Sequence, residues 1–169
     1  MNERKIVSIF LIIGMILSLF LVYEHFSASA SKFCSFGSTL DCGIVNKSPY
    51  ANLDGIFYLL TIDLNINFPL INISDMNWFF DFLTTNAFLG FITLLFVYIL
   101  NKNQNKKIFW IKEKDNKKWI VGILIFATIY GAGYLFAIQK FILVTYCLLC
   151  ILLDAVIILS LIMSMKIKD

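Results

Sequence analysis

Thr145-Tyr146-Cys147-Leu148-Leu149-Cys150 is the stretch around which the chain is organised, and it lies within an apolar run from Phe141 to Met165. Two cysteines at this spacing lie one helical turn apart, so their thiols can form a disulfide or pass one on. Cysteine also packs in apolar helices as a small hydrophobic side chain. The chain has four cysteines, and the other two are Cys34 and Cys42. Two pairs favour electron transfer between pairs over simple packing.

The composition is that of an integral membrane protein. Hydrophobic residues make up 60% of the 169 residues and the mean hydropathy is +0.84, whereas soluble domains contain about 45–50% apolar residues. The net charge of +3 is too small to indicate a nucleic-acid partner, so the expected surroundings are a lipid bilayer. A chain of this length predicts a single domain, residues 1–169, built from packed helices.

Long apolar runs predict an all-α bundle of four transmembrane helices. At about 1.5 Å per residue each run crosses, or nearly crosses, a hydrocarbon core of about 30 Å. A cleaved signal peptide is the alternative for the first run, because small residues follow it at 27–31, but the run exceeds the usual length of such a segment. The predicted spans are residues 6–23, 82–100, 119–139 and 141–165, with a turn at Lys140 and close helix approach at Gly122, Gly131 and Gly133.

Residues 24–81 form a polar, turn-rich outer loop between the first two spans, and this loop contains Cys34 and Cys42. Ser48-Pro49 is typical of a helix start, with the serine at the N-cap and the proline in the first turn. Apolar residues recur at helical spacing from there to Leu64. The pattern predicts a short amphipathic helix that lies on the membrane face.

The charges of the loops predict the orientation in the membrane. Residues 101–118 carry seven lysines against two acidic residues, a net charge of +5, whereas residues 24–81 carry two lysines against six acidic residues, a net charge of −4. Because positive loops remain in the cytoplasm, both termini are expected there and the outer loop on the opposite side. All four thiols then face the compartment in which disulfides form and persist.

The four cysteines allow two interpretations other than a redox relay. Four thiolates can hold zinc, but this spacing suits a closed cage poorly, so no metal is expected. The second alternative is a four-helix membrane scaffold protein with static structural disulfides, although a C-x2-C disulfide closes a short loop and adds little stability. A relay explains why one pair lies in an aqueous loop and the other at membrane depth, where a lipid-soluble electron acceptor would bind.

The chain resembles the vitamin K epoxide reductase family over about residues 6–165. The matching features are the outer-loop C-x7-C, the segment S-P-Y-A-N-L-D-G with Ser48 and Gly55, the C-L-L-C that opens the last span, and Asn86-Ala87-Phe88-Leu89-Gly90. The last segment resembles N-S-I-F-G of the animal enzymes, and no fused thioredoxin-like domain is expected. The resemblance is therefore closer to the animal-type stand-alone enzymes than to the thioredoxin-fused bacterial members, and it implies the endoplasmic reticulum membrane, or alternatively a prokaryotic cell membrane.

The resemblance implies a thiol–disulfide oxidoreductase that reduces a quinone (vitamin K, menaquinone or ubiquinone) or vitamin K epoxide and so promotes disulfide formation. Electrons would come from a separate thioredoxin-like partner that meets Cys34. Cys42 would pass them to Cys147, and Cys150 would react with the quinone. The other four-helix family of quinone-linked disulfide oxidases fits less well, because its C-x2-C lies near the first outer loop or span.

The resemblance also implies roles for residues around the quinone. Asn86 would donate a hydrogen bond to a quinone carbonyl, and Ser48 with Gly55 would shape the loop helix over the pocket. From the residues alone, Ser48 is equally well explained as an N-cap, and Asn86 as a satisfied polar group near a helix end.

Asp154 departs from the family pattern, because the animal enzymes carry a tyrosine four residues after the second cysteine of the C-x2-C. The resemblance therefore implies quinone reduction more strongly than epoxide reduction. Asp154 lies one turn from Cys150 on the same helix face, and an ionised carboxylate at membrane depth costs about 2.5–3.5 kcal/mol. We predict a protonated Asp154 that donates a hydrogen bond to the quinone. A helix–helix hydrogen bond, for instance to Thr93, is the alternative.

Overall fold

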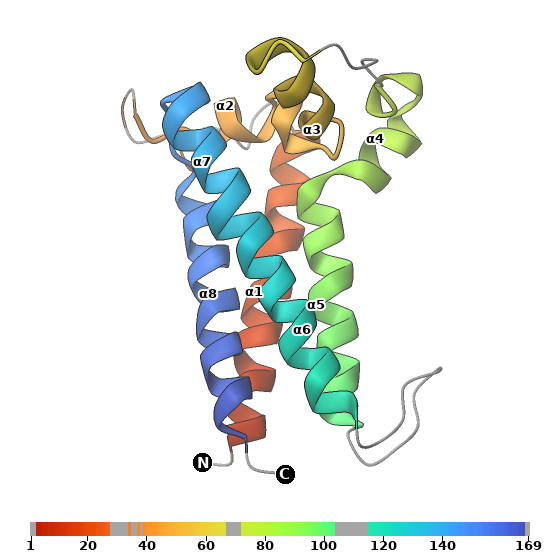
Figure 1. Cartoon of the computed structure of the whole chain (residues 1–169), viewed down its shortest axis with the longest axis vertical. Helices are drawn as coiled ribbons and strands as arrows, with labels where there is room; N and C mark the ends of the chain where they lie inside the picture. Colours follow the sequence, from red (N-terminus) through yellow and green to blue (C-terminus); the bar gives the residue numbers. More distant parts are fainter. Residues whose placement is uncertain are drawn as a thin grey trace.

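The computed structural model describes residues 3–27, 34, 37, 39–66, 72–103 and 115–167, and it is helical throughout these ranges apart from loops and two isolated β-bridges (Figure 1). Three helices are long and apolar enough to cross a membrane: α1 (Glu3–Phe26), the continuous helix Asn116–Leu143, and α8 (Leu148–Lys166). A fourth, α5 (Asn86–Lys102), is apolar but has only 17 residues. The prediction of a helical membrane protein is thereby confirmed. Residues 104–114 of the basic loop and the small residues after Ser27 lie outside the described ranges.

The continuous helix Asn116–Leu143 consists of α6 (Asn116–Thr128), the π-helical η6 (Ile129–Leu135), α7 (Phe136–Ile138) and the π-helical η7 (Gln139–Leu143). In the bundle, α1 packs against α5 and α8, and α6 packs against the same two helices (Figure 1). Their shared apolar core contains Val7, Leu11, Leu94, Val97, Leu100, Ile120, Leu124, Ile157 and Ile167.

Hydrogen bonds supplement apolar packing where α5 meets α1. The Asn101 amide Nδ2 donates to Ser8 Oγ at 2.9 Å and to the Arg4 carbonyl at 3.1 Å. Lipid tails are as apolar as the helix surfaces, so helix association in a bilayer depends on close packing and on such polar contacts. This contact joins the C-terminal end of α5 to the first turns of α1.

The outer-loop elements gather at one end of the bundle, and the start of α1 and the end of α8 lie at the other (Figure 1). The predicted continuous helix from Ser48 to Leu64 is divided into η2 (Pro49–Ala51), α3 (Gly55–Tyr58) and the π-helical η3 (Leu59–Asp63). The division arises because residues 52 and 53 bind elsewhere: Leu53 N donates to the Thr84 carbonyl at 3.0 Å, and Asn52 pairs with Thr85. These contacts tie the loop to the bundle.

The second apolar run is also divided, at Thr85. The short helix α4 (Trp78–Thr84) ends there, and α5 begins at the next residue with Thr85 as its N-cap. The Thr85 hydroxyl accepts a hydrogen bond from Phe88 N at 3.3 Å, which satisfies one of the unpaired donors of the first turn. Residues 82–84, which were predicted to start the second span, therefore belong to the outer-loop helix α4.

The turn before the last helix lies at residues 144–147 and not at Lys140, which is inside η7. Val144 has φ of 49°, in the left-handed region that β-branched residues rarely adopt. Thr145 N bonds back to the Gln139 carbonyl at 3.2 Å, so the preceding helix closes its last turn before the chain reverses. The residues from Phe141 to Leu143 thus continue the third long helix, and Cys147 becomes the N-cap of α8.

Only one of the three glycines predicted to allow close approach lies against another helix. A Cβ placed at Gly131 would collide with the Asp154 carboxyl group, whose Cγ would be 3.4 Å away. A Cβ at Gly122 or Gly133 would meet nothing within 4 Å. The prediction therefore holds at Gly131 alone, which lets η6 approach α8 beside Asp154.

Candidate redox-active site

All four cysteines are described and all are in disulfides, Cys34 with Cys42 and Cys147 with Cys150. The Cα atoms are 5.5 Å apart in the first pair and 5.2 Å in the second. Cys42 and Cys147 have no exposed surface, Cys34 is 3% exposed, and Cys150 is half-buried. The two disulfides share one apolar cluster with Leu21, Val22 and Ala87.

Backbone pairing brings the two cysteine pairs together. Asp41 N donates to the Tyr146 carbonyl at 3.1 Å, and Tyr146 N donates to the Thr39 carbonyl at 2.9 Å. These two bonds form a parallel β-bridge between Leu40 and Tyr146, so Cys42 and Cys147, which follow within two residues, enter the same cluster. A segment of the outer loop is thereby held against the start of α8.

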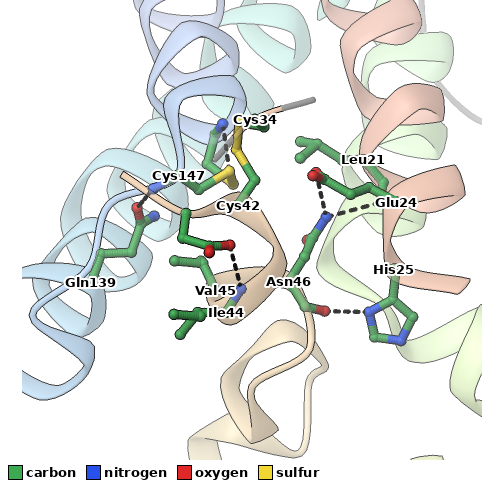
Figure 2. Close-up of a disulfide and its surroundings, with 12 residues drawn as sticks. Leu21, Glu24, His25, Cys34, Cys42, Ile44, Val45, Asn46, Gln139 and Cys147 are labelled. Atoms are coloured by element: carbon green, nitrogen blue, oxygen red, sulfur yellow. Dashed lines mark hydrogen bonds between the residues drawn. A yellow bond between two sulfur atoms is a disulfide. The ribbon is translucent and has the colours of Figure 1, made fainter. Parts of the chain in front are cut away.

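The Cys147 backbone and sulfur atoms are both hydrogen-bonded. Its N–H donates to Gln139 Oε1 at 2.8 Å, and its Sγ accepts from Cys150 N at 3.1 Å (Figure 2). Gln139 is 2% exposed, and from the sequence alone it is only the last residue of a predicted span. A polar side chain at the end of an apolar run is the signal that could have identified it.

A cavity lies beneath the outer loop, among α1, α2 (Cys42–Asn46), η2, α5, η6, α7, η7 and α8. It holds about 580 Å³ of space free of protein atoms, including its open mouth. Of the four cysteines only Cys150 lines it. The other lining residues are the apolar Leu21, Val45, Ala51, Ala87, Leu135, Ile138, Leu143 and Leu153 and the polar Asn46, Ser48, Tyr50, Asn86, Gln139 and Asp154.

Asn86 lines this cavity and also joins two elements of its wall. Its Nδ2 donates to the Tyr50 carbonyl of η2 at 2.8 Å, and its Oδ1 accepts from the Tyr130 hydroxyl of η6 at 2.8 Å. An amide NH2 has two hydrogens, so one N–H remains for a further acceptor. Asn86 is therefore both a structural bridge and a donor at the cavity wall.

Asp154 lines the same cavity one turn beyond Cys150, against Gly131. No described residue forms a hydrogen bond or ion pair with its carboxyl group. The alternative partner, Thr93, donates its hydroxyl to the Leu89 carbonyl of its own helix at 2.8 Å, and the described residues show no hydrogen bond between Thr93 and Asp154. The carboxyl group is thus available to a molecule in the cavity.

Ser48 and Gly55 contribute in different ways. Ser48 lines the cavity at the N-cap position of η2, but its hydroxyl donates to the Val45 carbonyl at 2.7 Å and caps nothing. Gly55 does not line the cavity. A Cβ there would lie 2.6 Å from Tyr50 Cα and 3.2 Å from the Pro49 carbonyl oxygen, so only glycine lets α3 approach η2 this closely.

The Tyr50 side chain, whose backbone lies against Gly55, is also hydrogen-bonded to η3. Its hydroxyl donates to the Asp63 carboxylate. Burial, and next this hydrogen bond, raise the pKa of Tyr50 above its usual value, so the hydroxyl stays neutral and remains a donor. The η2 segment is in this way held both by η3 and by Asn86.

We expect Gly55→Ala to lower the free energy of unfolding by about 1–3 kcal/mol, the usual cost of an overpacked contact. The new methyl group would collide with backbone at Tyr50, which Asn86 holds in place and which cannot rotate away. Thermal unfolding of the purified protein would measure the loss. Gly133→Ala is the matched control, because its methyl group meets nothing within 4 Å. Equal losses in both variants would show that the approach of α3 to η2 is not tight.

A comparison with known protein families places this geometry in context. The sequence model described as the Vitamin K epoxide reductase family matches residues 5–165, a range that contains both cysteine pairs and every residue that lines the cavity. No curated protein matches the chain.

Proposed function

Because the chain belongs to the vitamin K epoxide reductase family, a family of membrane thiol–disulfide oxidoreductases, we propose that it reduces a membrane quinone with electrons from a separate dithiol protein. One observation carries the proposal: the two disulfides share a buried cluster, and Cys150 is the one cysteine of that cluster that lines the cavity. Electrons that enter at the outer-loop pair therefore have a short path to a molecule in the cavity.

The path consists of three exchanges. A thiolate of the partner attacks Cys34, and the second partner thiol releases it, so the partner is oxidised and the outer pair reduced. The Cys42 thiolate then attacks Cys147, whose bond to Cys150 breaks, and Cys34 re-forms the outer disulfide. Finally Cys147 and Cys150 return to the disulfide as the quinone takes up two electrons and two protons and becomes the hydroquinone. A thioredoxin-like protein is the class of partner that supplies such a dithiol.

The cavity suits a quinone, which is an apolar ring with two carbonyl oxygens. Its wall is mostly aliphatic and carries a few polar groups, as small-molecule sites usually do. In our proposal the remaining N–H of Asn86 donates to one carbonyl, and a protonated Asp154 donates to an oxygen near Cys150. Because Asp154 stands where the animal enzymes have a tyrosine, we propose a quinone and not vitamin K epoxide as the main substrate.

We further propose that four helices cross the membrane and that α5 is the second of them in chain order. Its 17 residues extend about 25 Å, close to the hydrocarbon thickness, and α4 at its outer end exposes Trp78, Phe79 and Phe80, which suit a membrane interface. The termini are then cytoplasmic and the outer loop faces an oxidising compartment. The Asn86 segment favours an animal-type enzyme and the endoplasmic reticulum lumen; the outside of a prokaryotic cell membrane is the alternative.

The proposal is tested with the purified chain in proteoliposomes that contain ubiquinone, menaquinone, vitamin K or vitamin K epoxide. We expect a dithiol to drive reduction of at least one quinone, with both cysteine pairs cycling between disulfide and thiols. Alkylation followed by mass spectrometry measures the cysteines, and absorbance measures the quinone. If both disulfides persist in excess dithiol and no quinone is reduced, the cysteines are static staples of a scaffold protein.

A further inference from the structure

Glu24 is a buried carboxylic acid at the outer end of α1. It has no exposed surface, and its Oε1 has no hydrogen-bond partner among the described residues. Within the described ranges its Oε2 accepts only a long bond from Asn46 Nδ2, at 3.4 Å. A carboxyl group buried with an unpaired oxygen is accommodated far better neutral than charged. The surroundings of Glu24 therefore favour its protonated form.

The Glu24 carboxyl group lies beside the outer-loop disulfide (Figure 2). One of its oxygens, Cys34 Sγ and Cys42 Sγ all lie within 4.8 Å of one another. A side-chain rotation or one bridging water closes such a distance to a hydrogen bond. Cys42 itself is fully buried, so bulk water does not reach its sulfur from the surface.

The groups around Glu24 do not compensate a charge on it. In the described ranges no cation forms an ion pair with it; His25 instead lies 3.2 Å from Asp81. Lys47 and Asp41, the charged groups that act on Glu24 from a distance, oppose each other. The Asp41 carboxylate accepts a hydrogen bond from Ile44 N as the cap of α2. An apolar residue would fill the Glu24 position at lower cost.

We propose that Glu24 is the proton donor and acceptor of the Cys34–Cys42 pair, an inference that rests on the proposed function. When the partner's thiolate attacks Cys34 Sγ, the bond to Cys42 breaks and Cys42 leaves as a thiolate. That thiolate takes the proton from the Glu24 carboxyl group. When Cys42 next attacks Cys147 Sγ and the bond to Cys150 breaks, the Glu24 carboxylate takes the proton back.

This exchange explains how the negative charge that forms on the Cys42 sulfur is tolerated in an apolar cluster. A thiolate buried without a donor is costly, and proton transfer from an adjacent acid removes the negative charge from sulfur as it forms. Acid–base assistance of this kind contributes about 10²–10⁴-fold to a rate. The proton stays within the site through one cycle of the outer pair, so the buried cluster needs no water channel.

The test uses the full chain in proteoliposomes and dithiothreitol as the reductant. Thiol trapping at timed intervals measures the rate at which the Cys34–Cys42 disulfide is reduced, at a series of pH values. Each rate is then divided by the concentration of the reductant's thiolate at that pH. In the wild type this normalised rate should fall as Glu24 loses its proton at higher pH. Glu24→Gln should lower the normalised rate about 100-fold at low pH and should make it independent of pH. Glu24→Asp keeps a carboxyl group and should retain the decrease of the rate with pH.

Asp54→Asn is the matched control, because Asp54 is 1% exposed, has an oxygen with no partner among the described residues, and is not grouped with the sulfurs as Glu24 is. It should react as the wild type does. Redox-difference infrared spectroscopy of the wild type needs no variant to fold: a buried carboxyl C=O band should disappear when the outer pair is reduced. A wild-type rate and pH profile in Glu24→Gln, or an unchanged carboxyl band, overturns the inference. Failure of quinone reduction alone is distinct, because the outer pair would then be reduced with the same dependence on Glu24 while no quinone is consumed; disulfides that persist in excess dithiol would overturn both proposals.

Discussion

In the Cys42→Ser variant, a protein dithiol is expected to reduce quinone only at the uncatalysed rate, while a small dithiol still drives quinone reduction. A protein partner reaches only the outer-loop pair, and without the Cys42 thiol no electrons pass from Cys34 to Cys147. A small membrane-permeant dithiol can enter the cavity and reduce the Cys147–Cys150 disulfide directly. Because enzymes accelerate their reactions by many orders of magnitude, the contrast between the two reductants should be large. Quinone absorbance in proteoliposomes measures both rates.

Cys150→Ser is the companion variant, since it removes the cysteine that lines the cavity. It should abolish quinone reduction with either reductant and should trap a disulfide between Cys42 and Cys147, which non-reducing mass spectrometry would identify. If Cys42→Ser accepts electrons from a protein dithiol as fast as the wild type, the outer pair is not an intermediate of the relay. The shared cluster would then be a matter of packing.

Asp154→Leu is expected to lower kcat/KM for the quinone by roughly 5- to 150-fold. This range corresponds to about 1–3 kcal/mol, the usual effect of a buried hydrogen bond left unmade. Asp154→Asn keeps a donor at the same place and should retain most of the activity. Steady-state quinone reduction by the small dithiol isolates this step from the outer pair.

The matched control is Ala155→Leu, which adds the same side chain to an exposed position of α8 and should leave kcat/KM unchanged. Because Asp154 packs against Gly131, helicity and thermal unfolding of each variant must be compared with the wild type. A normally folded Asp154→Leu protein that reduces quinone at the wild-type rate would assign Asp154 to helix packing alone.

The existence of the long helices could be predicted from the sequence because apolar runs of this length are local and need no partner to be recognised. The residues at which these helices end could not be predicted in the same way. The chain reverses at Val144 and not at Lys140, and the helix expected from Ser48 to Leu64 is divided at residues 52–54. In both places a backbone hydrogen bond determines the helix boundary: Thr145 bonds back to Gln139, and Leu53 bonds across to Thr84.

The composition of the site was likewise open to prediction, and its arrangement was not. The two cysteine pairs follow from spacing, and Asp154 follows from the cost of a carboxylate within an apolar run. That Cys42 and Cys147 share one cluster depends on the pairing of Leu40 with Tyr146, residues far apart in the chain. The spacing of residues along a sequence carries no information about such a contact.

Glu24 shows most clearly what the tertiary structure alone decided. In the sequence it is an acidic residue directly after an apolar run, where a charge ordinarily marks the exposed end of a transmembrane helix. Burial by the outer loop, with the Cys34–Cys42 disulfide beside it and Asn46 as a donor to it, turns the same residue into an enclosed acid. The sequence by itself determined a helical membrane protein with two cysteine pairs. Only the folding of the loop onto the bundle determined which polar groups are enclosed with the sulfurs, because enclosure depends on contacts between distant segments.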